Sequence, residues 1–125
     1  MQLPIIIEEI AICQDAQGHF CLNDLHKASG GAKRHQPSNW LALQQTIELI
    51  EELSTPGIPG VEQIQPVSVI NGGPNRGTYV VKILVYAYAM WISAKFNILV
   101  IETFDAIVTQ ALKMQEFRVH RTRQL

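Results

Sequence analysis

The stretch "NGGPNRGTYVVKILVYAYAMWISAKF", residues 71–96, contains the signals for a turn, a strand and a helix in immediate succession. Asn, Gly and Pro favour a tight turn, and the flanking runs "PVSVI" and "TYVV" are β-branched or aromatic, so the sequence predicts a β-hairpin with a glycine-rich tip. The apolar run "KILVYAYAMWIS" is too short to cross a membrane and fits a central buried helix. The tip holds one cation, Arg76. The hairpin either closes as a plain turn or contacts an anionic partner.

The part of the chain before this stretch predicts another hairpin and two helices. The runs "PIIIEEIAICQ" and "HFCL" flank the turn-like "DAQG", which indicates a β-hairpin over residues 5 to 22. In "NDLHKAS", Asn23 is a candidate N-cap of a short helix that ends at "GG". Pro37 suits the first turn of a second helix over "SNWLALQQTIELIEELS", whose apolar residues follow a helical period. "TPGIPG" ends this helix, and we expect a surface loop through about Gln65.

The predicted elements add up to one domain. Ser93 is a candidate cap of a last helix over residues 94 to 117. The sequence thus predicts a single compact α+β domain over residues 1 to 117, with the order ββααββαα. The basic tail, residues 118 to 125, is expected to be a solvated end, with extension of the last helix or contact with phosphate as alternatives.

Composition sets the class of protein. A chain of 125 residues fits one domain, and its apolar content of 47% and charged content of 17% are typical of a soluble globular protein. The N-terminus lacks the features of a signal peptide, so we expect a cytoplasmic protein. Cys13 and Cys21 flank the first predicted turn; we expect reduced thiols, with a cross-hairpin disulfide as the alternative. The four histidines form no helical ligand pair, and we expect no metal or cofactor.

Charged residues are unevenly distributed along the chain. The formal net charge is −1, which argues against a general polyanion binder. Acidic residues lie mainly in residues 1 to 18 and 48 to 62, and neither block contains Lys or Arg. No acid occurs in residues 63 to 101, and residues 19 to 47 hold three Lys and Arg against one acid. This distribution fits one positive face on a neutral protein, or ordinary solvated charges.

The motifs of several enzyme classes are incomplete. "SGGAK" lacks the first glycine and the final Ser or Thr of a phosphate-binding loop, and "GGPNRG" joins two strands where a dinucleotide fingerprint would open a helix. Asp24 and His26 do not share a helix face. For Cys21 and His19, a packed thiol beside a rim imidazole is the simpler interpretation. We therefore expect no enzymatic activity, and a nuclease would need an acidic metal cluster on the basic face.

A nucleic-acid binder needs cations that reach phosphate and polar side chains that reach base edges, and "AKRHQPSN" offers both at a predicted helix N-terminus. Acidic residues in the second half of that helix leave only its first half for DNA. A helix pair followed by a hairpin with a cationic tip is the arrangement of a winged-helix module. The candidate DNA-contacting residues are Lys33, Arg34, His35, Gln36, Ser38, Asn39, Gln45, Asn75 and Arg76.

The succession "FCLNDLHKASGG", "NWL" and "GGPNRGTYVVKILVYAYAMWISAKFNILVIETFD" resembles the KilA-N domain of phage, bacterial and large DNA-virus proteins, over about residues 18 to 110. That domain is similar to the APSES DNA-binding domain of fungal transcription factors. The resemblance implies a winged-helix-like, DNA-binding fold, found in phage antirepressor and regulator proteins. It matches Asn23 and Asp24 to the cap of the first helix and Trp40 and Trp91 to core tryptophans. The wing motif is matched by Gly72, Gly73, Gly77, Thr78 and Tyr79, which would shape and anchor the tip.

Two functions follow from the residues and the resemblance. The first is a non-enzymatic module of phage or prophage origin that binds double-stranded DNA in transcription or lysogeny control, in the cytoplasm of a bacterial host. The alternative is a protein-interaction module, for instance an antirepressor that binds a repressor. Expected partners are DNA and, as further candidates, a second copy of the chain or a repressor, but no membrane and no small-molecule substrate. Family members usually carry further C-terminal domains, so the chain either works alone or is part of a longer protein.

Overall fold

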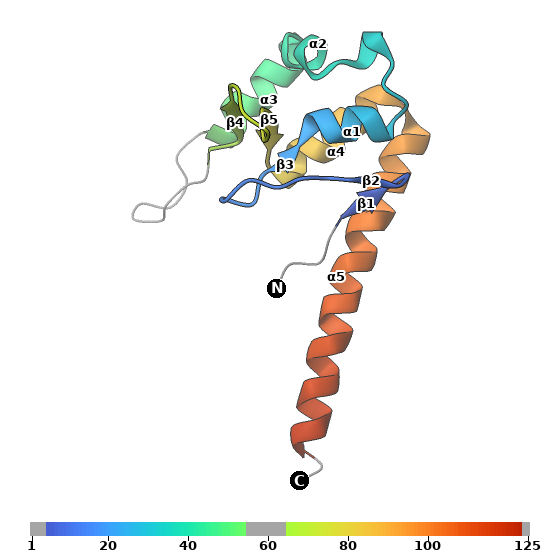
Figure 1. The fold of residues 1–125 in the computed structure, drawn as a ribbon. Coiled ribbons are helices and arrows are strands. Elements are labelled where there is room, and N and C mark those ends of the chain that lie inside the picture. The colour runs from blue at the N-terminus through green and yellow to red at the C-terminus, as the bar shows by residue number, and fades with distance from the viewer. Residues whose placement is uncertain (1–4, 55–64, 124–125) are drawn as a thin grey trace.

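A computed structural model of the chain describes residues 5–54 and 65–123, with side chains described as far as Thr109. Within these residues the chain combines small antiparallel sheets with helices, so the predicted α+β class is confirmed (Figure 1). The strands are β1 (Ile6–Ile7), β2 (Ile10–Ala11), β3 (Phe20–Cys21), β4 (Val67–Ile70) and β5 (Gly77–Val80). The helices are α1 (Leu22–Ala28), the 3₁₀ helix η1 (Lys33–His35), α2 (Pro37–Leu41), α3 (Gln44–Ser54), α4 (Lys82–Ile92) and α5 (Ala94–Arg123). Most of the predicted loop after the second helix lies outside the described residues.

The hairpin predicted around "NGGPNRG" is confirmed. β4 and β5 pair antiparallel, with Val67 opposite Val80 and Ile70 opposite Gly77. β5 is also the central strand of its sheet, because β3 pairs with its other edge in the order β3–β5–β4. Tyr79 and Val80 are buried. The hairpin is therefore held to the body by its second strand, which leads directly into α4.

The single hairpin predicted for residues 5 to 22 is wrong. β1 pairs with β2 through a tight turn at Glu8 and Glu9, whose φ angles are 50° and 67°. β3 joins the sheet of the β4–β5 hairpin instead. The turn at "DAQG" does form, since Gln14 and Phe20 make an antiparallel bridge around it. The local turn signal was correct, but the strand partner of β3 lies far along the chain, where no local pattern specifies it.

The start of α1 also differs from the prediction. Asn23 is not the N-cap, because α1 begins at Leu22 and no side chain caps it. The Oδ1 of Asn23 accepts a hydrogen bond from the backbone N–H of Thr78 at 3.0 Å. Asp24 likewise accepts from the backbone N–H of Cys13 at 2.9 Å. Both side chains satisfy distant backbone donors and not the first turn of their own helix.

The second predicted helix is interrupted. The sequence predicts one continuous helix, but α2 and α3 are separated by two residues that belong to neither. The N–H of Leu43 donates to the carbonyl of Trp40 at 3.1 Å, a tight last turn that ends α2. As a result Thr46 is only 3% exposed, whereas Ile47 is 37% exposed. Beyond the break, Ile50 and Leu53 still pack against the core as a helical period predicts, whereas Ile47, which a continuous helix would place on the same face, does not.

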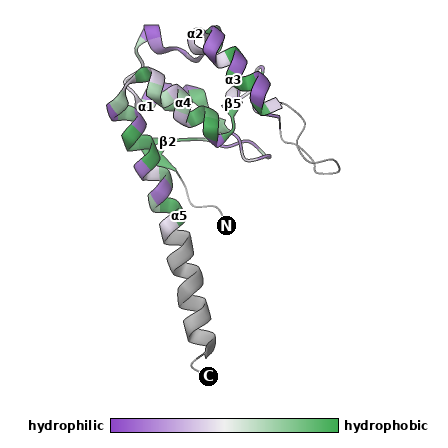
Figure 2. Ribbon diagram, turned by 180° about the vertical axis from the view of Figure 1, so that it is seen from behind, coloured by the Kyte–Doolittle hydropathy of each residue, from purple (hydrophilic) through white to green (hydrophobic). Residues whose placement is uncertain are grey.

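The predicted central buried helix is confirmed. The fully buried residues of α4 are Leu84, Val85, Tyr88 and Ala89. Trp40 packs edge-to-face on Tyr88 with ring centroids 5.3 Å apart, while Trp91 is half-buried at the edge of the core. Ser93 caps α5, since its Oγ accepts a hydrogen bond from the N–H of Phe96 at 3.0 Å. Figure 2 shows the contrast between the hydrophobic α4 and the hydrophilic η1 above it.

α5 continues as a helix to Arg123, past the predicted end at residue 117. The side chains of the basic tail lie outside the described part of the chain. Cys13 and Cys21 are both free thiols, the first exposed and the second buried. Within the described residues, none of the helices combines the length and apolar character that a membrane span requires.

His19 is buried and links two segments, in contrast to the rim position expected for it. Its Nδ1 lies 2.6 Å from Asp15 Oδ2, and its Nε2 lies 2.5 Å from the carbonyl oxygen of Gln65. The ring therefore joins the turn at Asp15 to Gln65, just ahead of β4. Burial acts to raise the pKa of Asp15, but hydrogen bonds from the backbone and ring of His19 outweigh it, and the pKa lies below its ordinary value.

Gly77 lies where the hairpin meets α1. Its φ is 153°, and a Cβ at this position would be 3.0 Å from Asn23 Oδ1 and 3.2 Å from Cys21 Sγ. This close approach places the N–H of Thr78 within reach of Asn23. A glycine is therefore required here both by the backbone angle and by the space.

We expect Asp15→Asn to destabilise the fold at neutral pH by about 1.5–3 kcal/mol, the range for hydrogen bonds to charged groups. Since the folded pKa of Asp15 lies below its ordinary value of 3.8, the carboxylate stabilises the fold above that value. This contribution is lost as the pH falls through the folded pKa, so variant and wild type should converge in acid. Urea denaturation across the acid range measures this, with the exposed Asp105→Asn as control; a difference independent of pH would contradict it.

Gly77→Ala should destabilise the fold by about 1–3 kcal/mol, because the added methyl group overpacks the contact with α1. Gly72→Ala is the matched comparison, since its Cβ would meet nothing within 4 Å and adds only the strain of a positive φ. In an Asn23→Ala background, Gly77→Ala should cost less. Thermal denaturation of the double-mutant cycle measures this coupling, and strictly additive effects would show that the contact with Asn23 does not limit the site.

Candidate nucleic-acid interface

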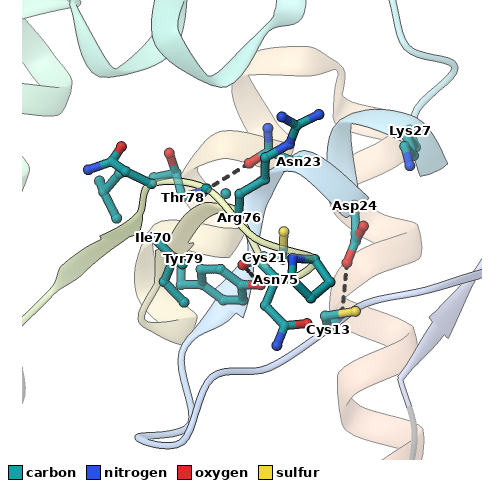
Figure 3. A pocket seen from close by; sticks show the side chains of 15 residues that line it. Cys13, Cys21, Asn23, Asp24, Lys27, Ile70, Asn75, Arg76, Thr78 and Tyr79 are labelled. Atoms are coloured by element: carbon teal, nitrogen blue, oxygen red, sulfur yellow. Dashed lines mark hydrogen bonds between the residues drawn. The ribbon is translucent and has the colours of Figure 1, made fainter.

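Two clefts meet at the Asn23–Thr78 hydrogen bond. The hairpin cleft has a volume of about 570 Å³ and lies between the β4–β5 hairpin and the start of α1 (Figure 3). On the side away from the hairpin it is lined by Cys13, Cys21, Asp24 and Lys27. The connector cleft, of about 300 Å³, is lined by His26, Gln36, Pro37, Ser38 and Leu41. Asn23 and Thr78 line both clefts, so their hydrogen bond forms the shared wall.

The tip of the hairpin, residues 71–76, is exposed and held in shape from below. Gly72 and Gly73 adopt φ angles of 96° and 81°, which favour glycine. The hydroxyl of the buried Tyr79 donates to the carbonyl oxygen of Asn75 at 2.8 Å (Figure 3). The side chains of Asn75 and Arg76 stay exposed. The tip is therefore a fixed loop that presents the amides of Asn71 and Asn75 and the guanidinium group of Arg76 to solvent.

The connector, residues 32–39, is also fixed from inside. The Nδ2 of Asn39 donates to the carbonyl oxygens of Lys33 and Arg34 at 3.3 and 3.4 Å. The hydroxyl of Tyr88 donates to the carbonyl oxygen of His35. The side chains of Lys33 and Arg34 are exposed. The backbone of η1 is thus tied to α2 and to the core, while its two cations face solvent.

His35 is the least exposed of the three residues in η1. Its ring packs edge-to-face against Trp91, with centroids 5.3 Å apart. Burial lowers the pKa of His35 from its ordinary value of 6.5, and the neighbouring charge of Arg34 acts in the same direction. His35 is therefore a neutral packing residue at neutral pH and adds no positive charge to the connector.

The sequence-predicted residues fall into three groups in space. Gln36 and Ser38 line the connector cleft, and Asn75 and Arg76 line the hairpin cleft. Four of the predicted residues therefore line the two clefts that share Asn23 and Thr78. The residues of η1 lie at the end of α2 away from the hairpin (Figures 1 and 2), and Asn39 contacts their backbone. Gln45 is exposed on α3 and lines neither cleft.

Sequence reasoning missed two residues of this surface. Asn23 joins the hairpin to α1 through a bond that spans 55 positions of the chain, so only its place in the "NDL" motif singled it out. Lys27 lines the hairpin cleft opposite the tip. The excess of positive charge in residues 19 to 47 includes Lys27, but no local motif distinguishes it from the other cations there. The contact across the cleft depends on how α1 packs on β5, which no local pattern reveals.

Comparison with known proteins identifies the family of the chain. The family model of the KilA-N domain matches residues 4–110. The chain is also 36% identical over 102 residues to the protein kilA of Escherichia phage P1, an alignment that covers 82% of this chain and 36% of that protein. The chain thus spans about a third of the length of this relative. No solved structure gave a significant match. Because the family model covers most of the chain, including both clefts and the hairpin between them, the chain belongs to the KilA-N domain family.

Proposed function

We propose that the chain is a non-enzymatic module that binds double-stranded DNA in a regulatory protein of phage or prophage origin. The observation that supports it most directly is that Gln36, Ser38, Asn75 and Arg76, from two distant parts of the sequence, line two adjoining clefts that share Asn23 and Thr78. Membership of the KilA-N family and similarity to a phage protein support the same proposal.

The two clefts suggest that the connector contacts the bases and the hairpin contacts the DNA backbone. The exposed polar side chains at the start of α2 offer hydrogen-bond donors and acceptors for base edges. The hairpin tip offers a guanidinium group for the sugar–phosphate backbone, in the role of a wing. The exposed cations of η1 would contact phosphate on the other side of α2. The acids of α3, Glu48, Glu51 and Glu52, would keep the far end of that helix away from DNA.

A protein-interaction module is the second candidate. Ile83 and Met90 lie two turns apart on α4 and are 55% and 56% exposed, so one face of this helix offers apolar side chains to solvent. An apolar face of this kind would suit a protein partner such as a repressor. Salt-dependent binding to random duplex DNA separates the two candidates, because a module that recognises only protein would not bind duplex DNA at any salt concentration.

Arg76→Ala should weaken binding to all duplex sequences and reduce the slope of log K against log salt by about one unit, because one phosphate contact is lost. Gln36→Ala should leave the slope unchanged and relax the sequence preference, since an amide contact to a base carries no charge. Fluorescence anisotropy at several salt concentrations gives the slope, and selection from a random duplex library gives the preference. Lys95→Ala, an exposed cation on α5, is the control; an equal effect of Arg76→Ala and Lys95→Ala would reject the proposed face.

The three residues of η1 should separate by the same measurement. Lys33→Ala and Arg34→Ala should each reduce the salt slope, whereas His35→Ala should leave it unchanged at neutral pH because the ring is neutral there. His35→Ala should instead lower the thermal stability by about 1 kcal/mol through loss of the ring contact with Trp91. A salt slope that changes with His35→Ala would show that this ring is charged when DNA is bound.

A further inference from the structure

The hairpin cleft has a cation on each side. Lys27 extends from the last turn of α1, and Arg76 extends from the hairpin tip. Both side chains are exposed, and neither forms an ion pair within the part of the chain that the structure describes. Figure 3 shows Lys27 on α1 and Arg76 on the hairpin, both as residues that line the cleft. The lining holds these two cations against one carboxylate, Asp24, so its charges sum to a positive value that an anion between the cations would balance.

A neutral donor lies on the same side of the cleft. The N–H of Thr78 can only donate, so the oxygen of the Asn23 amide must face it and the NH₂ group must face away. This NH₂ group has no hydrogen-bond partner within the described residues. Asn23 and Arg76 line the same cleft. An ammonium, a guanidinium and an amide are the groups that commonly bind phosphate oxygens.

The one carboxylate of the cleft is engaged elsewhere. Asp24 accepts a hydrogen bond from the backbone N–H of Cys13 at 2.9 Å, and in Figure 3 its side chain points away from Arg76. The thiols add no negative charge. The hydrogen bond to Asp24 raises the pKa of Cys13, and burial raises the pKa of Cys21, so both are protonated at neutral pH.

We propose that the hairpin cleft is a binding site for a single phosphodiester of the DNA backbone, held jointly by Lys27, Arg76 and the amide NH₂ of Asn23. This inference rests on the proposed function and extends it from the connector and hairpin to α1. A phosphate held between α1 and the tip fixes the hairpin on the DNA at a defined distance from α2. The connector cleft, which shares Asn23 and Thr78, then faces the bases beside that phosphate.

The first test is a double-mutant cycle of Lys27→Ala and Arg76→Ala, with Lys95→Ala as the control and anisotropy on a random duplex as the readout. Each single variant should weaken binding about tenfold, the value for a lost hydrogen bond to a charged group. Because both residues hold the same phosphate, the double variant should lose much less than the product of the two effects. A multiplicative loss, or a Lys27→Ala variant that binds like the control, overturns the inference and leaves the proposed function intact.

A scan of single neutral methylphosphonates along the preferred duplex identifies the phosphate directly. When the methylphosphonate replaces the bound phosphate, Lys27→Ala should no longer weaken binding. Arg76→Ala should lose its effect at the same position in the duplex. Two different positions overturn the shared site. Asn23→Asp keeps an oxygen for the N–H of Thr78 but brings a carboxylate into the cleft, so it should weaken DNA binding with little change in thermal stability. Unchanged binding by this variant also overturns the inference.

One further outcome distinguishes free phosphate from a DNA phosphate, and another distinguishes failure of this inference from failure of the proposed function. In the first, inorganic phosphate perturbs the NMR signals of the Asn23 side-chain amide while Lys27→Ala leaves duplex binding unchanged. This pair of results would identify a site for free phosphate and would overturn the DNA contact. Wild-type protein that binds no duplex at low salt would reject the proposed function itself, and the DNA contact with it. Lys27→Arg should restore duplex binding, because it returns the charge to the same position.

Discussion

The hydrogen bond from the backbone N–H of Thr78 to the side chain of Asn23 joins the two halves of the candidate interface. It ties the central strand β5 to the first turn of α1, and the absence of a side chain at Gly77 allows the two elements to come this close. On either side of this bond lies a cleft, one bordered by the hairpin tip and the other by the connector. The spacing between the tip and α2 therefore depends on a single contact between distant parts of the chain.

The buried helix α4 connects the hairpin on one side to α2 and η1 on the other. β5 runs directly into it, so the hairpin has little freedom to move relative to the core. On the other side, the ring of Tyr88 packs on Trp40 of α2, and its hydroxyl binds the carbonyl oxygen of His35. One buried tyrosine thus holds both α2 and η1. A buried apolar core therefore positions the exposed polar residues of the connector and of the tip.

The distribution of charged residues allows a chain of formal net charge −1 to present a basic surface. The exposed cations Lys27, Lys33, Arg34 and Arg76 belong to α1, η1 and the hairpin tip, which lie around α2. The carboxylate of Asp24 is bound to a backbone N–H, and the pKa of Asp15 is kept low by His19, so these acids serve the fold. The acids of α3 lie beyond the break after α2. Local arrangement, and not the sum of charges, sets the potential at the clefts.

Residue patterns determined the elements that depend on near neighbours in the chain. Glycines set the β4–β5 turn, the apolar run set the buried α4, and Ser93 capped α5, because each signal acts within a few residues. Tertiary structure decided the pairing of β3 with β5, the break between α2 and α3, and the use of Asn23 for Thr78 and not for its own helix. It also brought Lys27 opposite Arg76. Such contacts join residues far apart in sequence, and they are chosen by which surfaces can be buried together, a property of the whole chain and of no single segment.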